Sequence, residues 1–227
     1  MTAAPAFDAS VAPAHTRLDR SSHRRIYVVG DVHGCVAELR ALWRRLDPRD
    51  DDLVVFVGDL VRKGPASDEV VGFVRARDNA TSVRGNNEAA VLRGDAEADL
   101  SPASRATIES LPLVVSWDET VVVHGGVYPD RSLSDHTPRD LLEARAVPRE
   151  NGYNGPFWFD SYEGPPRVVF GHTVLADSLV DEWAVGLDTG CVHGGRLTAY
   201  DCGRETVVSV PAERTYRPRS ENRILQP

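Results

Sequence analysis

Two side chains that could bind a metal ion stand close together near the start of the chain. Asp31 and His33 lie in the sequence GDVHG at 30–34, directly after the apolar run Ile26–Val29. A carboxylate and an imidazole aimed at one point suit a divalent transition metal. The alternative is a structural role in which Asp31 caps the following helix, since aspartate is a preferred N-cap residue. Recurrence of the pattern further along the chain favours the metal site.

Four further apolar segments end in the same way, each beside glycine. The residues that follow these segments are Asp59 after 53–57, Asn86 after 81–83, His124 after 120–123 and His172 after 167–170. Short apolar runs of this kind predict buried strands. Ligands of open α/β sheets gather beyond the carboxyl ends of the strands. Five such ends therefore predict one common site.

The expected chemistry is two-metal hydrolysis of a phosphate compound. Mixed Asp, Asn and His ligands suit Mn²⁺ first, with Fe²⁺ or Zn²⁺ as alternatives, better than Ca²⁺ or Mg²⁺. A pair of such ions can activate water and neutralise charge on a phosphoryl group. Lys63 and Arg84 stand next to the predicted ligands and are expected to hold phosphate oxygens. The alternative is that both are ordinary surface cations.

Composition excludes some classes of partner. The chain has 227 residues and a net charge of −8, which argues against a nucleic-acid scaffold. It contains no apolar run of membrane-spanning length. The three cysteines suggest no disulfide framework, and a reducing cytoplasm is the expected location. Oligomeric state is left open.

The elements that must position these side chains form one α/β domain. Helical spacing predicts helices at 36–46, 68–77 and 138–145 between the strands. The segment Pro148–Pro166 is rich in Gly, Pro and aromatic residues and is expected to be a long ordered loop. Residues 1–22 are expected to be a disordered tail, residues 23–210 the domain, and residues 211–227 a surface strap or disordered tail.

Five motifs together resemble the calcineurin-like metallophosphoesterases, within them the phosphoprotein phosphatase branch that includes bacterial diadenosine tetraphosphatases and serine/threonine protein phosphatases. The motifs are GDVHG at 30–34, GDLV at 58–61, RGNNE at 84–88, HGG at 124–126 and GHT at 171–173. The segment DTGCVHGGRLT at 188–198 is similar to the same group. The resemblance implies a four-layer αββα sandwich with the metals at its centre.

The resemblance also implies a role for each ligand. Asp31 and His33 would bind the first metal, and Asp59 would bridge both metals. Asn86, His124 and His172 would bind the second. A hydroxide that bridges the two metals would attack the phosphorus, with Arg145 in LLEAR at 141–145 as a further phosphate contact.

Two positions depart from the family pattern. The family's histidine proton donor is replaced by Asn87, and the aspartate that orients it in protein phosphatases is replaced by Arg62. General acid catalysis contributes about 10²–10⁴-fold, and most for a poor leaving group. The sequence therefore predicts a bias towards dinucleoside polyphosphates and other substrates with good leaving groups. His193 is the candidate replacement acid, and the alternative is an exposed turn histidine.

The prediction is thus a dinuclear phosphoester or phosphoanhydride hydrolase, whose substrate is a phosphorylated small molecule, a nucleotide or a phosphoprotein. One alternative is a serine/threonine phosphoprotein phosphatase. Another is a catalytically weak module that binds metal and phosphate for regulation. Because all six metal positions are intact, the enzyme is favoured.

Overall fold

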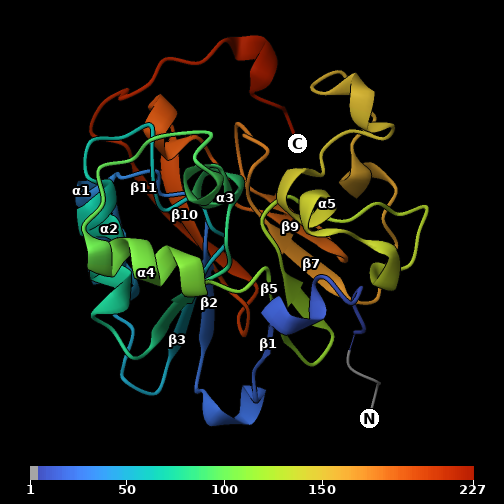
Figure 1. Ribbon diagram of the computed structural model, residues 1–227, viewed down its shortest axis with the longest axis horizontal. Coiled ribbons are helices and arrows are strands. Elements are labelled where there is room, and N and C mark those ends of the chain that lie inside the picture. The colour runs from blue at the N-terminus through green and yellow to red at the C-terminus, as the bar shows by residue number, and fades with distance from the viewer. Residues whose placement is uncertain (1–4) are drawn as a thin grey trace.

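The computed structural model describes residues 5–227, which fold around two β-sheets (Figure 1). The six-stranded sheet has the order β1-β5-β6-β7-β9-β8, and the five-stranded sheet has the order β11-β10-β2-β3-β4. The strands are β1 His15–Arg17, β2 Ile26–Val29, β3 Leu53–Phe56, β4 Ala80–Ser82, β5 Val114–Trp117, β6 Thr120–Val122, β7 Arg167–Phe170, β8 Leu179–Val180, β9 Ala184–Gly186, β10 Arg196–Asp201 and β11 Thr206–Pro211. The α-helices are α1 Val36–Leu46, α2 Ser67–Arg75, α3 Asn86–Arg93, α4 Pro102–Ser110 and α5 Pro138–Glu143.

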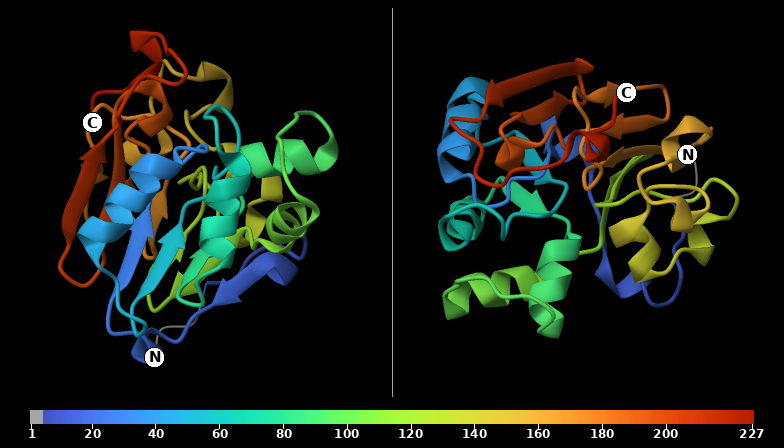
Figure 2. Two further views of the ribbon diagram at one scale, coloured as in Figure 1. Left: turned by 90° about the vertical axis from the view of Figure 1, so that its left-hand side faces the viewer. Right: turned by 90° about the horizontal axis from the view of Figure 1, so that it is seen from above.

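Side-chain alternation along the strands builds three stacked interfaces. In β2, Tyr27 and Val29 pack towards α1 and α2, whereas Ile26 and Val28 pack between the two sheets. Such alternation follows from the two-residue period of a strand. On the outer face of the six-stranded sheet, a third cluster includes Trp158. Figure 2 shows helices on one side, α5 with irregular segments on the other, and both sheets between them. The predicted four-layer αββα sandwich is confirmed.

Parallel pairing brings the functional strand ends to the middle of the molecule. Strands β2, β3 and β4 run parallel in one sheet, and β6, β7 and β9 run parallel in the other. The crossovers between the parallel strands β2, β3 and β4 run through α1 and α2, as parallel pairing requires. The carboxyl ends of both sets then open on the same region, where the loops carry polar residues.

The N-terminal segment differs from the disordered tail expected for residues 1–22. Strand β1 pairs in parallel with β5 at the edge of the six-stranded sheet, and Phe7 and Val11 are buried. The small and polar residues of this segment gave no sign of a strand, because backbone pairing at a sheet edge requires no apolar run. Residues 1–4 of the expected tail lie outside the described residues.

The C-terminal segment, residues 212–227, crosses the surface at the top of Figure 1. The Arg217 amide donates to the Val192 carbonyl at 2.9 Å, and the Leu225 amide donates to the Val174 carbonyl at 2.9 Å. The segment is therefore anchored to the loop that follows β7 and to the loop that follows β9. In residues 5–227, no helix is long and apolar enough to cross a membrane.

Candidate active site

The predicted ligands meet at the carboxyl ends of the parallel strands. Ligand atoms of Asp31, Asp59 and His124 all lie within 4.8 Å of one another, and the three residues are buried. They come from the ends of β2, β3 and β6, so both sheets contribute. Asp31 does not cap α1, whose N-cap position is Cys35, and instead accepts from the His172 backbone amide at 3.1 Å. The structural alternative for Asp31 is excluded.

Asp59 lies between two groups of ligands. Its Oδ2 atom is 3.4 Å from His33 Nε2, and His33 Nε2 is 3.7 Å from Asp31 Oδ2. Its Oδ1 atom is 3.4 Å from His124 Nε2. Asn86 Oδ1 lies 2.9 Å from His124 Nε2 and 3.0 Å from Nδ1 of His172, the predicted ligand after β7. One oxygen of Asp59 therefore faces each group.

Backbone carbonyls orient two histidines of this centre. His33 Nδ1 is 3.2 Å from the Val61 carbonyl, and His124 Nδ1 is 2.8 Å from the Val57 carbonyl. Since a carbonyl only accepts, each Nδ1 carries the proton and donates it, and in His33 this leaves the Nε2 lone pair facing the site. Burial, followed by the charge of Lys63, lowers the pKa of His33 to about 3. The ring is therefore neutral, as metal binding requires.

The backbone is strained where it delivers the ligands. His33, Asp59 and His172 have φ values of 49°, 52° and 64°, which cost about 1–3 kcal/mol each for residues with a side chain. At Gly171 a Cβ atom would lie 2.0 Å from Asp31 Oδ1. Glycine at this position therefore allows the loop after β7 to approach the ligand. Clustered strain of this kind is typical of functional sites.

Glu88 supports the loop that carries Asp59. Its carboxylate accepts backbone N–H groups from Asp59 at 2.9 Å, Val61 at 3.1 Å and Gly85 at 2.7 Å. Burial, and then the charge of Asp59, raises the pKa of Glu88 to about 7. The sequence placed Glu88 inside a motif without giving it a role, because two of its three partners are backbone atoms 27 and 29 residues away.

Glu88→Gln is expected to lower the free energy of unfolding by about 1–3 kcal/mol, because an amide NH₂ would then face a backbone N–H that has lost its acceptor. Chemical denaturation measures the loss. Glu97→Gln is the matched control. Glu97 is exposed and makes no side-chain hydrogen bond in the described residues, so the free energy of unfolding of this variant should be unchanged. Equal stability of the two variants would exclude this supporting role.

The donor set fits a pair of divalent cations. Asp31, Asp59 and Asp188 are each at most 4 % exposed. Burial raises the pKa of Asp31, and the carboxylates of Asp188 and Asp59 raise it further. Bound cations would relieve this repulsion. Asp188 was not among the predicted site residues, although it too follows a parallel strand, β9, and the same strand-end rule could have found it.

Arg62 and Asn87 are bonded to each other. Arg62 Nη1 donates to Asn87 Oδ1 at 2.7 Å, and Asn87 Nδ2 donates to Asp59 Oδ2 at 2.5 Å. The two positions that depart from the family pattern thus remain partners. A cation and an amide stand where a carboxylate and an imidazole were expected. Asn87 therefore lies at the site but supplies no titratable proton.

Three predicted phosphate contacts have different positions. Lys63 Nζ lies 2.8 Å from His33 Nε2, and Arg145 Nη2 lies 2.6 Å from His172 Nε2, so both cations adjoin the ligands. Arg84 instead donates to the carbonyls of Glu109 and Leu111 at the end of α4. Carbonyls at a helix C-terminus attract guanidinium groups, so Arg84 is bonded to the protein itself, and its contact with phosphate stays a prediction.

His193 occupies the turn after β9. Its Nδ1 lies 2.6 Å from the Arg217 carbonyl, and Arg219 Nη1 lies 3.4 Å from its Nε2. The proton is therefore on Nδ1 and is donated to a carbonyl. Burial lowers the pKa of His193; the bond to Arg217 opposes that shift, and the charge of Arg219 adds to it. Proton donation by His193 stays a prediction.

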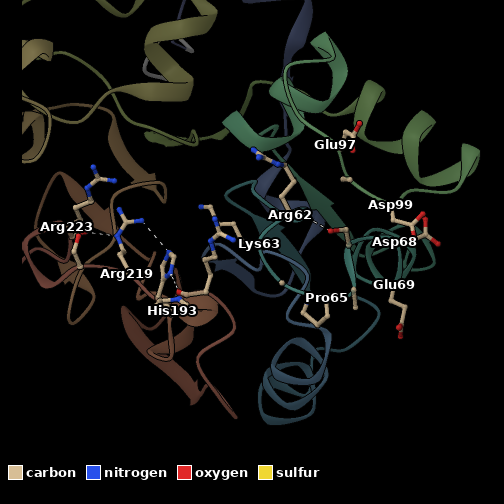
Figure 3. A pocket seen from close by; sticks show the side chains of 17 residues that line it. Arg62, Lys63, Pro65, Asp68, Glu69, Glu97, Asp99, His193, Arg219 and Arg223 are labelled. Atoms are coloured by element: carbon tan, nitrogen blue, oxygen red, sulfur yellow. Dashed lines mark hydrogen bonds between the residues drawn. The ribbon is translucent and has the colours of Figure 1, made fainter.

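A cavity of about 810 Å³ opens beside the centre (Figure 3). Lys63 and Arg62 lie in its middle, with His193, Arg219 and Arg223 on one side in the figure. The opposite side carries four acidic residues: Asp68, Glu69, Glu97 and Asp99. A second cavity of about 210 Å³ is lined by Asn86, Arg145 and His172 among others. Each cavity therefore adjoins the centre, the larger through Lys63, which contacts His33, and the smaller through Asn86 and His172.

Comparisons with known proteins agree with this geometry. Residues 24–195 match the calcineurin-like phosphoesterase family. The chain is 29% identical to the asymmetrical bis(5'-nucleosyl)-tetraphosphatase PrpE of Bacillus velezensis, covering 83% of this chain and 93% of that protein. It is 29% identical to serine/threonine-protein phosphatase 1 of Salmonella typhimurium, covering 81% and 94%.

A solved structure described as a candidate diadenosine tetraphosphatase superposes with a TM-score of 0.77 at 30% identity, covering 87% of this chain and 97% of that one. The family match spans more than half of the sequence and includes every predicted metal ligand. The chain therefore belongs to the calcineurin-like phosphoesterases, and it is a metallophosphoesterase, a hydrolase of phosphoester or phosphoanhydride bonds.

Proposed function

We propose that the enzyme cleaves phosphoanhydride bonds of dinucleoside polyphosphates in preference to phosphoserine esters. The observation that carries the proposal is the Arg62–Asn87 pair, bonded at 2.7 Å beside Asp59. A serine alkoxide is a poor leaving group and needs a proton as the bond breaks. A nucleotide phosphate leaves as a stable anion. A fixed guanidinium supports such an anion without proton transfer.

Six side chains would hold two metal ions: Asp31, His33, Asp59, Asn86, His124 and His172. When bound, the ions lower the pKa of water and neutralise charge on the phosphoryl group. The protein's own share is to fix the ligand orientation and to surround the phosphate with cations. Mn²⁺ is the proposed metal, because carboxylate, amide and imidazole are mixed. A cytoplasmic location is part of the proposal, since the three cysteines are free thiols.

The relatives' names support this substrate class. The Bacillus velezensis relative is named a tetraphosphatase, as is the solved structure at 30% identity. The Salmonella typhimurium relative is named a serine/threonine-protein phosphatase, which keeps phosphoprotein as the second candidate. The two candidates differ in the leaving group, so the missing acid discriminates between them.

The test is phosphate release with added Mn²⁺ from diadenosine tetraphosphate, a nitrophenyl ester and a phosphoserine peptide. The expected result is fast turnover of the first two and turnover of the peptide that is at least about 10²-fold slower. Fast peptide turnover would contradict the proposal. If His193→Ala then slowed peptide turnover and removed its fall at high pH, His193 would be identified as the proton donor. No turnover of any substrate by metal-loaded protein would favour the regulatory module.

A further inference from the structure

The C-terminal segment delivers an arginine to the large cavity. Between its anchors at Arg217 and Leu225, the segment passes from the turn of His193 to the loop that follows His172. Both loops belong to the active site. Arg219, two residues after the first anchor, is half-buried and lines the cavity, whereas Arg223 is exposed at its rim.

Arg219 is held in place by neutral acceptors. Its Nη2 donates to the Tyr153 hydroxyl at 2.6 Å, its Nε donates to the Arg223 carbonyl at 2.9 Å, and its Nη1 lies 3.4 Å from His193 Nε2. None of these groups carries a negative charge. The guanidinium is therefore ordered without being neutralised, which is the state expected of an anion-binding side chain.

Several cations share this neighbourhood. The guanidinium carbons of Arg145, Arg219 and Arg223 lie 4.2, 5.3 and 5.7 Å from the ring centre of Tyr153. Lys63 and Arg62 stand in the same cavity as Arg219 (Figure 3). Within residues 5–227 none of these five side chains forms a salt bridge, although the protein has a net charge of −8. Packing five cations together is unfavourable until an anion binds among them.

Two of these cations contact the predicted metal ligands, and the others lie farther from them. Lys63 contacts His33, and Arg145 contacts His172. The cavity is much larger than one phosphate group, and its acidic side would repel a polyanion towards the arginines. The basic side thus offers one continuous path for several phosphates.

We propose that Arg219 and Arg223, with Lys63 and Arg62, bind the phosphates next to the one attacked at the metal centre, which makes the enzyme selective for chains of three or more phosphates. The proposal rests on the proposed function and extends it to the substrate's phosphate chain. It assigns recognition to the chain of phosphates and not to the nucleoside. Arg219 and Arg223, which lie far from the family motifs in the sequence, would thus contribute to specificity.

The test compares Arg219→Ala with Arg214→Ala in the metal-loaded full chain. Arg214 belongs to the same segment but lies over the Tyr216 ring, 4.8 Å from its centre, and does not line the cavity. In Arg219→Ala, the ratio of kcat/KM for diadenosine tetraphosphate to that for nitrophenyl phosphate should fall about tenfold or more, chiefly through KM, because a charged hydrogen bond is lost. The ratio should not change in Arg214→Ala. Arg223→Ala is the second variant and should lower the ratio less.

Inorganic tripolyphosphate is the probe that separates the chain from the nucleoside. It should inhibit nitrophenyl phosphate turnover far better than orthophosphate does, and Arg219→Ala should remove most of that advantage. Equal inhibition by tripolyphosphate and orthophosphate would overturn the proposal. An unchanged ratio of kcat/KM values in both Arg219→Ala and Arg223→Ala would also overturn it. If diadenosine tetraphosphate is not hydrolysed but tripolyphosphate still inhibits through Arg219, the subsite stands and the proposed substrate fails.

Discussion

Asp59→Asn is expected to reduce phosphate release from every substrate by more than about 10³-fold. Substitution of outer partners of metal ligands already costs about 10–100-fold, and Asp59 lies within the ligand group itself. Its two oxygens face His33 and His124 at 3.4 Å each. An amide has one oxygen, so its NH₂ group would face one of the two ligand groups. The substitution thus removes both a donor atom and a negative charge.

Metal content provides a readout that is independent of turnover. Purified Asp59→Asn protein should retain less Mn²⁺ per chain than the unsubstituted protein after gel filtration, as measured by elemental analysis. Asp118→Asn is the matched control, because Asp118 is exposed in the turn between β5 and β6. Its activity and metal content should not change. Full metal content and turnover in Asp59→Asn would rule out a bridging position for this carboxylate.

The local pattern of apolar residues was sufficient to predict the central strands and the residues that follow them. Buried strands read directly as short apolar runs, and β2 and β7 have the predicted bounds. Because parallel strands open at the same edge, the residues after them could be expected to meet, as Asp31 and His172 do. The rule works since it depends on strand order alone and not on side-chain conformation.

Features set by distant contacts were not predictable in this way. Arg84 follows a strand just as the ligands do, but carbonyls of α4 hold its guanidinium. Strand β1 is recognisable only through its partner β5, about 100 residues later. Arg219 reaches the cavity because the chain turns back over the site, and nothing in its immediate sequence indicates this. Each of these outcomes depends on tertiary structure, which local spacing does not encode.

The Arg62–Asn87 pair allows the missing acid to be restored. Introducing Arg62→Asp together with Asn87→His should raise turnover of a phosphoserine peptide by about 10²-fold, because general acid catalysis contributes about 10²–10⁴-fold. The existing bond of 2.7 Å shows that the two positions face each other, and the longer imidazole at position 87 would offset part of the length lost from arginine to aspartate. The aspartate would orient the imidazole and stabilise its protonated form. Turnover of diadenosine tetraphosphate should not rise and is expected to fall, because its leaving group needs no proton and the double variant lacks the Arg62 guanidinium that supports the leaving phosphate.

Each substitution alone should fail, for electrostatic reasons. In Asn87→His the Arg62 guanidinium would lower the pKa of the new imidazole and disfavour the protonated donor. In Arg62→Asp a fourth carboxylate would approach Asp31, Asp59 and Asp188 without a positively charged partner, and the added repulsion would destabilise the site. The gain should therefore appear only in the double variant, as a coupling energy in a double-mutant cycle. The pH profile of peptide turnover should also acquire a limb that falls at high pH, where the new acid loses its proton. A double variant with normal metal content, no gain on the peptide and no new limb would show that these two positions do not reach the leaving group.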